Sequence, residues 1–236
     1  MEHEGVLVGT ILLIFTKIQS RDGSAIRCHV TSWYVQPAYR AYAGLFYLKA
    51  LSRKNVLYMN ISAQPTAQPF LAIHGFSKYS RGQFFAVPVM HLMSKATDCK
   101  IIKATSIPDA PFEAFDRDLL LNHAEYGCIC FWCVTSEQAY PFVFRTHITR
   151  KFLPTPQLVY CREIGDFVKF ARPIGLILAQ RGKYVIRIDS NGPIPGLIGK
   201  YFDGVTPRWY KGPTQPRLGD LAFTQFAMCG DRLSLF

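Results

Sequence analysis

The chain has 236 residues, of which 49% are hydrophobic, 14% aromatic and 18% charged. This composition excludes a disordered chain and can bury the core of one large domain or two small ones. The first four residues, Met1-Glu2-His3-Glu4, are acidic where a signal peptide is basic, and the apolar run 6–15 is too short to cross a bilayer. Seven cysteines without a paired framework favour reduced thiols. We therefore expect a soluble cytoplasmic protein that does not bind membranes.

The net charge of +11 is concentrated in the N-terminal half of the chain. Between Asp22 and Asp98 there are eight lysines and arginines and no aspartate or glutamate. A positive field of this kind attracts polyanions, either a phosphorylated cofactor or a nucleic acid. A solvated basic surface that only aids solubility would show the same composition, so charge alone leaves these alternatives open.

The first ninety residues predict a mixed α/β segment. Residues 6–18 and 26–35 are rich in β-branched and aromatic side chains and flank the turn-forming run Ser20-Arg21-Asp22-Gly23-Ser24, so they predict an antiparallel hairpin. Apolar residues at helical spacing predict a helix over 38–53 that ends in basic residues. Further on, the patterns predict a strand over 56–61, a helix over 66–74 that stops at Gly75, and a second hairpin of 76–79 with 83–87 around Arg81-Gly82.

A similar order of elements returns after a proline-containing linker at 106–111. We expect helices over 112–126 and 166–180, the second kinked by Pro173 and Gly175. The predicted strands are 128–135, 142–148, 157–161 and 184–189, followed by a closing hairpin of 208–211 with 220–229. The sequence therefore predicts two consecutive lobes, 1–105 and 106–236, related by a duplicated architecture.

One segment carries a recognisable family signature. The run Val35-Gln36-Pro37-Ala38-Tyr39-Arg40, followed by Ala41-Tyr42-Ala43-Gly44, resembles the strand, loop and helix start of GNAT acyltransferases. In that family the unpaired N–H groups at the helix start hold a pyrophosphate. The chain departs from the family's glycine-rich pattern at Ala43 and Leu45.

A second family element follows at the expected distance. It matches at Ala67 and Gly75-Phe76, has Gln64 in place of asparagine, and has Leu71 where many members carry the tyrosine that protonates the departing thiolate. The resemblance covers residues 1–90 by motif and 112–230 by element order. The first lobe lacks the family's usual first strand and two helices.

The resemblance implies a fold, a cofactor and an activity. The fold would be a mixed, mostly antiparallel central sheet flanked by helices in two lobes, and the cosubstrate would be acetyl-CoA or another acyl-CoA. The acyl group would pass to an amine of a small molecule or peptide. The residues implied to contact the acyl-CoA are Tyr34, Val35, Arg40, Ala41, Tyr42, Ala43, Gly44 and Gln64.

The base that would deprotonate the amine is open, because residues 23–97 contain no carboxylate. His29 and His74 are candidates, since imidazole titrates near neutrality, although a lone histidine is often structural. Glu125, Glu163 or Asp166 from the second lobe could also supply the base.

Other chemistries find less support in the sequence. The run Cys128-x-Cys130-x-x-Cys133 could suggest zinc, but the alternation of a strand sends Cys133 to the opposite face from the other two, which favours core thiols and no metal site. A nucleic-acid-binding motif is missing. Two readings remain: an acyltransferase, or a GNAT-fold binding or scaffolding protein that has lost catalysis. The sequence does not determine the oligomeric state.

Overall fold

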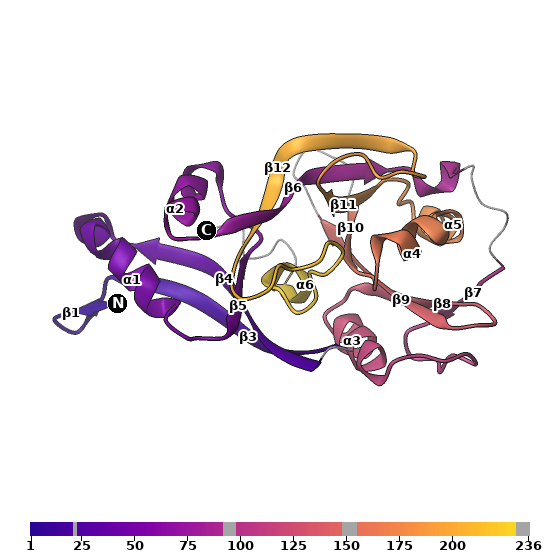
Figure 1. Cartoon of the computed structure of the whole chain (residues 1–236), viewed down its shortest axis with the longest axis horizontal. Helices are drawn as coiled ribbons and strands as arrows, with labels where there is room; N and C mark the ends of the chain where they lie inside the picture. The colour runs from indigo at the N-terminus through magenta and orange to yellow at the C-terminus, as the bar shows by residue number, and fades with distance from the viewer. Residues whose placement is uncertain (21–22, 92–97, 148–154, 230–236) are drawn as a thin grey trace. The chain divides into compact units, whose positions relative to one another are not determined.

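A computed structural model describes residues 1–20, 23–91, 98–147 and 155–229 (Figure 1). These residues form two compact units. Unit 1 contains residues 1–79 and 206–216, and unit 2 contains residues 80–205 and 217–236. The units do not follow the boundary predicted at residue 105, because residues 80–105 belong to unit 2 and residues 206–216 to unit 1. Strands β6 (Ser77–Ala86) and β12 (Gly199–Lys211) each contribute residues to both units.

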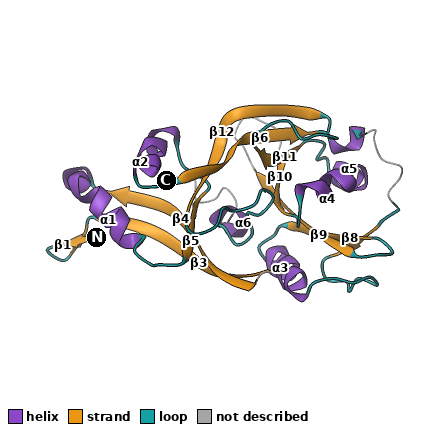
Figure 2. Cartoon of the chain, in the orientation of Figure 1, coloured by secondary structure: helices purple, strands orange, loops and turns teal. Residues whose placement is uncertain are grey.

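Unit 1 is a mixed sheet with its helices at the ends of two central strands (Figure 2). Its strand order is β3-β4-β5-β12, in which β4 and β5 are parallel and the other pairs antiparallel. Its other elements are β1 (Glu2–His3), β2 (Val6–Leu7), β3 (Gly9–Ser20), β4 (Gly23–Val35), the 3-10 helix η1 (Pro37–Tyr42), α1 (Ala43–Ala50), β5 (Val56–Asn60), η2 (Pro65–Ala67) and α2 (Gln68–Ile73).

The predicted first hairpin is confirmed, with β3 and β4 paired from Gly9↔Val35 to Ser20↔Gly23. Arg21 and Asp22 of the predicted turn lie outside the described residues. The register passes from Thr10↔Tyr34 to Leu12↔Thr31, so β4 carries one extra residue and β3 none. Ser32 in this bulge has φ +50°. The bulge therefore lies on β4, four residues before η1 begins.

Unit 2 is built on the strand order β6-β11-β10-β9-β8-β7, with β10 and β11 parallel and the other described pairs antiparallel. A mostly antiparallel mixed sheet flanked by helices is thus confirmed as the fold class. The remaining elements are η3 (Pro88–Met90), β7 (Lys100–Lys103), α3 (Ala114–Glu125), β8 (Ile129–Val134), β9 (Ala139–His147), β10 (Thr155–Tyr160), α4 (Ile164–Lys169), α5 (Ala171–Ala179), β11 (Ile186–Ser190) and α6 (Gln225–Cys229).

Two predicted hairpins were wrong. Residues 77–79 and 83–86 of the predicted hairpin belong to the single strand β6. Gly82 allows a close backbone approach and not a turn, since a Cβ there would lie 2.2 Å from the Phe202 carbonyl oxygen. Residues 208–211 are the end of the long strand β12, and 225–229 form α6 instead of a return strand. Local pattern could not distinguish a short helix here from a strand.

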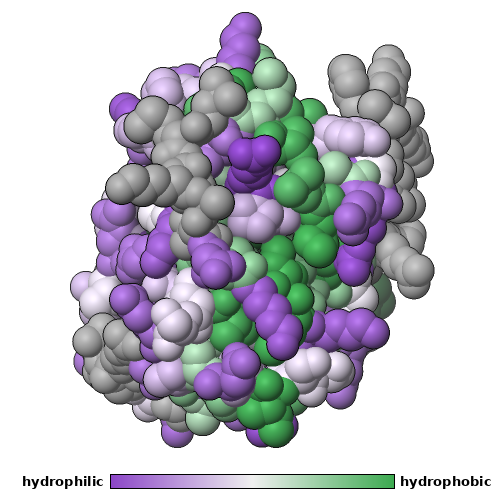
Figure 3. Space-filling view, turned by 90° about the vertical axis from the view of Figure 1, so that its right-hand side faces the viewer, coloured by the Kyte–Doolittle hydropathy of each residue, from purple (hydrophilic) through white to green (hydrophobic). Residues whose placement is uncertain are grey.

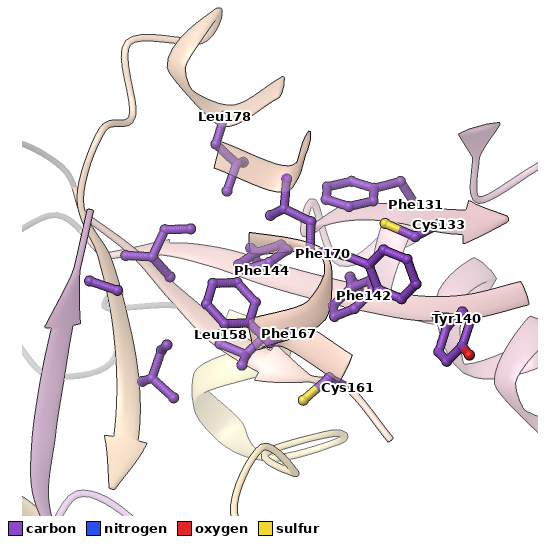
Figure 4. Close-up of a cluster of buried hydrophobic side chains, with 14 of the residues drawn as sticks. Phe131, Cys133, Tyr140, Phe142, Phe144, Leu158, Cys161, Phe167, Phe170 and Leu178 are labelled. Atoms are coloured by element: carbon purple, nitrogen blue, oxygen red, sulfur yellow. The ribbon is translucent and has the colours of Figure 1, made fainter. Parts of the chain in front are cut away.

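The kink predicted in the helix over 166–180 is confirmed as a break between α4 and α5 at Phe170. Pro173 lies in the first turn of α5, where its missing N–H costs little. Below these two helices is the core of unit 2, in which the aromatic rings of Phe142, Phe144 and Phe167 are fully buried (Figure 4). This core positions the parallel pair β10 and β11 and the helices that connect it.

Hydrophobic side chains are also exposed. Figure 3 shows a band of apolar surface on one face of the molecule, and the exposed apolar residues of unit 2 include Met90, Leu176 and Tyr184. Within the described residues, no helix has the length and apolar character needed to cross a membrane.

Candidate functional site

The predicted site centres on the parallel pair β4 and β5 of unit 1. The strands pair from Ile26↔Val56 to His29↔Met59, so they are neighbours in the sheet. β5 ends one residue later at Asn60, whereas β4 continues for six residues to Val35. On this side, the end of β4 therefore has no strand partner in the described register. Its other side remains paired with β3.

The residues at the end of β4 alternate in exposure. Val35 is buried, Tyr34 is 55% exposed and Trp33 is half-buried. The indole Nε1 of Trp33 is buried and has no hydrogen-bond partner among the described residues. A buried donor without a partner is costly, so it is a candidate to bind an acceptor group supplied from outside.

The segment predicted as a phosphate-binding loop is the 3-10 helix η1, which continues directly into α1. The Tyr39 N–H donates to the Gln36 carbonyl at 2.9 Å, and the Ala43 N–H donates to the Arg40 carbonyl. Amides used in this way are not available to an anion. Arg40, Ala41 and Tyr42 are exposed, so the positive charge at this point comes from the side chain of Arg40.

The space between the end of β4, α1 and α2 is filled by aromatic rings. Trp33 lies 4.6 Å from Phe70 and 5.1 Å from Tyr47, measured between ring centroids. Phe70 stacks on His74 at 3.8 Å. This aromatic cluster of Trp33, Tyr47, Phe70 and His74 fixes the position of α2 against the strand pair.

His74 ends α2, and its tautomer is set by its surroundings. Its Nδ1 lies 2.8 Å from the Phe70 carbonyl oxygen, which can only accept, so Nδ1 carries the hydrogen. The neutral ring then has its lone pair on Nε2. That atom lies beside Gly44 in the first turn of α1, 3.6 Å from where a Cβ of residue 44 would be. The structure thus brings together two residues predicted for the site, His74 and Gly44.

His29 occupies a different environment from His74. Its side chain is 1% exposed on β4, and burial, with Arg208 and Arg27 nearby, lowers its pKa to about 3. Such a group is neutral at physiological pH and a weak proton acceptor. Of the two candidate bases, His74 is the better placed to exchange a proton with a ligand.

Burial keeps a thiol and a hydroxyl group beside the strand pair in their neutral forms. Burial raises the pKa of the Cys28 thiol to about 12 and raises that of the Tyr47 hydroxyl above its usual range. The acidic residues of unit 1 are Glu2, Glu4 and Asp22, none of them on β4, β5 or the two α-helices. The thiol and hydroxyl inside the site are therefore uncharged, and the charge of the site is positive, from Arg40 at its rim and from the buried Arg27 and Arg208 beside His29.

The residues of the second motif lie on and beside η2 and α2. Gln64 is exposed and precedes η2, where its carbonyl accepts the Ala67 N–H at 2.9 Å. Leu71 is 2% exposed and packs into the core of unit 1. Gly75 follows α2 with φ +81°, which agrees with a helix-stopping glycine.

Sequence reasoning missed two basic residues of β12. Lys211 Nζ donates to the His74 carbonyl oxygen at 2.9 Å, and Arg208 is buried and donates to the Ile61 carbonyl oxygen. Both come from a strand more than 130 residues after β5, so no local pattern could have placed them. The charge of Arg208 explains part of the low pKa of His29, and Lys211 holds the end of α2.

The cysteine run lies on and beside β8 in unit 2. Cys133 is buried, and the Cys128 thiol donates to the Ala227 carbonyl oxygen at 3.4 Å. Burial raises the pKa of Cys128, Cys130 and Cys133, which keeps these thiols protonated. Within the described ranges, no group of three His, Cys, Asp or Glu side chains is placed to hold a metal ion.

Comparison with known proteins gives a match in structure and none in sequence. No protein-family model matches the chain, and no curated protein does. A GCN5-related N-acetyltransferase from Anabaena variabilis superposes with a TM-score of 0.54 at 10% identity, covering 88% of this chain and 60% of that one. The chain has a GNAT-type fold.

A second match supports the same fold. A protein of Pyrococcus horikoshii assigned as an acetyltransferase superposes with a TM-score of 0.50 at 14% identity, covering 94% of this chain and 75% of that one. The chain spans about 60% of the length of the Anabaena protein.

Proposed function

We propose that this protein transfers an acyl group from an acyl-CoA to an amine of a small molecule or peptide, at the end of β4 in unit 1. The observation that carries the proposal is the register of the parallel pair, which stops at His29↔Met59 while β4 continues to Val35 and leads into η1. A strand edge of this kind can line an extended ligand with its backbone groups.

The residues present fit coenzyme A in part. Arg40 is exposed at the start of η1 and could pair with a phosphate, while the indole N–H of Trp33 could donate to an amide carbonyl of the pantetheine arm. The amides of η1 fit less well, because Tyr39 and Ala43 already use theirs inside the turn. We therefore expect phosphate binding to depend on the side chain of Arg40 more than on the backbone.

The chemistry requires a proton acceptor and a donor to the thioester carbonyl. Backbone N–H groups near Tyr34 and Val35 are the candidates to polarise that carbonyl, and the lone pair on His74 Nε2 is the candidate to accept the proton of the amine. Attack by the amine nitrogen forms the C–N bond and breaks the C–S bond. The thiolate leaves, and the proton released by the amine passes through His74 or water.

Two observations favour a second function, that of a GNAT-fold binding or scaffolding protein without catalysis. Leu71 is buried where the family's tyrosine would protonate the thiolate, and the η1 amides are bonded internally. In this alternative the acyl-CoA would still bind and no turnover would follow.

Isothermal titration calorimetry with CoA and acetyl-CoA tests the shared part of both functions. Arg40→Ala should weaken binding by roughly 1–3 kcal/mol through loss of a charge-assisted contact. Lys54→Ala is the matched control, because Lys54 is an exposed cation beyond the other end of α1. Equal losses in the two variants would show that the ligand responds only to net charge and does not bind at η1.

Release of CoA from acetyl-CoA in the presence of a panel of amines separates the two functions. If His74 accepts the proton, His74→Gln should reduce the rate by about 100- to 10,000-fold and leave the affinity for CoA nearly unchanged. Binding of acetyl-CoA with no turnover above the uncatalysed rate for any amine would favour the scaffolding function.

A further inference from the structure

The two outermost strands of the described sheets differ in how they are protected. In the described part of the chain, β3 pairs only with β4, and β7 pairs only with β8. Each strand therefore presents one edge of backbone N–H and C=O groups to its surroundings. Such an edge can template pairing with another extended chain unless the sequence prevents it.

The edge at β7 has the features that prevent pairing. The strand has four residues, and exposed lysines stand at both its ends, Lys100 and Lys103. Short length and lysine are the usual protection of an edge strand, because pairing would bring the two charges against another backbone.

The edge at β3 has none of these features. It is 12 residues long, contains no proline and carries a single charge, on Lys17. The bulge of the hairpin lies on β4, so β3 is not bent away from a partner. Leu12 is 41% exposed and Phe15 36% exposed.

The N-terminus covers only the first residue of this edge. The Gly9 N–H donates to the Met1 carbonyl oxygen at 3.1 Å, and the Met1 amino group donates to the Gly9 carbonyl oxygen at 2.7 Å. Beyond Gly9, no described residue pairs with the edge from Thr10 to Ile18, which leaves it open to a further strand.

We propose that the β3 edge binds the β3 edge of a second copy of this chain, so that two molecules form one continuous antiparallel sheet. The recognition is by main-chain hydrogen bonds, which require an extended segment as the partner. The inference is independent of the proposed acyl transfer.

The sequence of β3 is complementary to itself about Leu13. A two-fold axis at this residue places Ile11 opposite Phe15 of the second copy, and Leu12 opposite its Ile14. Thr10 meets Thr16 of the second copy, and Lys17 lies beyond the contact, because the Gly9 that would face it is covered by Met1. Pairs of an aromatic with a β-branched residue and pairs of two threonines are favourable across strands. Lys17, the one charged residue of β3, does not face Lys17 of the second copy. The edge therefore favours an isologous dimer over a random partner.

Sedimentation velocity at increasing protein concentration tests the proposal. The parent chain should show a monomer and dimer in exchange. Leu12→Lys should weaken association at least tenfold, because it adds a charge to the centre of the edge. Leu45→Lys is the matched control, because Leu45 is 69% exposed on α1 and is not part of the β3 and β4 strand pair. This variant should associate like the parent. A parent chain that stays monomeric at 200 µM, taken as roughly the upper range of a useful affinity, would overturn the proposal.

A pair of double variants tests the register. Thr10→Lys with Thr16→Lys places like charges opposite each other at both ends of the contact, whereas Thr10→Glu with Thr16→Lys places opposite charges there. From two cross-strand pairs we expect the first variant to associate roughly 2- to 30-fold more weakly than the second. Equal association of the two, with unchanged circular dichroism and thermal unfolding, would reject an antiparallel pairing centred on Leu13.

Discussion

Units 1 and 2 contain the same local topology with opposite electrostatics. In unit 1, β4 leads through η1 and α1 to the parallel strand β5. In unit 2, β10 leads through α4 and α5 to the parallel strand β11, with Gln157 paired to Arg187. Each crossover therefore places a helix start at the end of a strand, where an anion could in principle bind.

The helix start in unit 2 is already occupied by the protein's own carboxylates. Glu163 and Asp166 form a capping box at the first turn of α4, in which Asp166 accepts the Glu163 N–H at 3.2 Å. The nearest cation, Arg162, is bound to the buried Asp116, with its Nε 2.7 Å from Oδ2. A phosphate would meet negative charge at this position.

The helix start in unit 1 has no acidic residue in its first turn and presents Arg40. The comparison teaches that the strand and helix order alone does not locate an anion site. The charge carried by the side chains in the first turn decides whether an anion can bind there. We therefore place the proposed function in unit 1 and give Glu163 and Asp166 a structural role.

The largest effect we expect is on the charge network of unit 2. Asp116 is 0% exposed and accepts the Tyr160 hydroxyl at 2.8 Å besides pairing with Arg162. Asp116→Ala leaves the guanidinium without its partner and should cost about 3–5 kcal/mol in urea unfolding. Asp118→Ala on the same helix removes an exposed carboxylate and should change stability by less than about 0.5 kcal/mol. Similar losses for the two would show that the network contributes little.

The next effect is a dependence of stability on pH in unit 1. The pKa of His29 is about 3 in the folded protein and 6.5 as the ordinary value, so between these limits the unfolded chain binds more protons. Stability from this group is present above pH 6.5 and is lost as the pH falls toward 3, by about 2 kcal/mol between pH 6.5 and 4.5.

The measurement is denaturant unfolding at a series of pH values for the parent, His29→Gln and His3→Gln. The first variant should have the flatter profile, because its side chain does not titrate. The exposed His3 should have no such effect when replaced. If the parent and His29→Gln lose stability in parallel, the acid sensitivity belongs to other groups.

The sequence predicted the strands β3, β4 and β5 and the helices of unit 1 because these depend on local signals. The β-branched runs, Pro37 and Gly75 mark the element ends within a few residues. It failed where the deciding contact is distant. Gly82 looked like a turn residue, but its role is set by the Phe202 carbonyl, 120 residues away in the sequence.

The candidate site shows the same limit. The placement of His29, His74 and Gly44 on their elements followed from the sequence. The environments that distinguish the two histidines depend on Arg208 and Lys211 of β12, which the sequence placed in a different lobe. The internal bonding of η1 was also hidden, because the residues of a 3-10 turn and of an open phosphate-binding loop are similar.

A smaller effect is expected at the position of the family's missing tyrosine. Leu71 is 2% exposed in the core of unit 1, so Leu71→Tyr should overpack it and cost about 1–3 kcal/mol without raising turnover. Leu45→Tyr on the exposed face of α1 should be nearly neutral. CoA release and urea unfolding are measured together. A faster enzyme with full stability would show that the ring finds room beside the aromatic cluster and acts as an acid.

The smallest effect concerns Gly44, at the helix start that distinguishes unit 1 from unit 2. A Cβ at this position would make an ordinary contact, 3.6 Å from His74 Nε2, so alanine fits. Because alanine is the better helix former, Gly44→Ala should stabilise the protein by roughly 0.5–1 kcal/mol in thermal unfolding. Gly75→Ala is the opposing control, since φ +81° strains any other residue and should make the same change destabilising.

The added methyl group in Gly44→Ala also restricts the space beside His74 Nε2. If the ligand reaches that atom, the variant should bind acetyl-CoA more weakly while being more stable. A stabilised variant with unchanged affinity would place the ligand away from the first turn of α1 and remove His74 from the proposed chemistry.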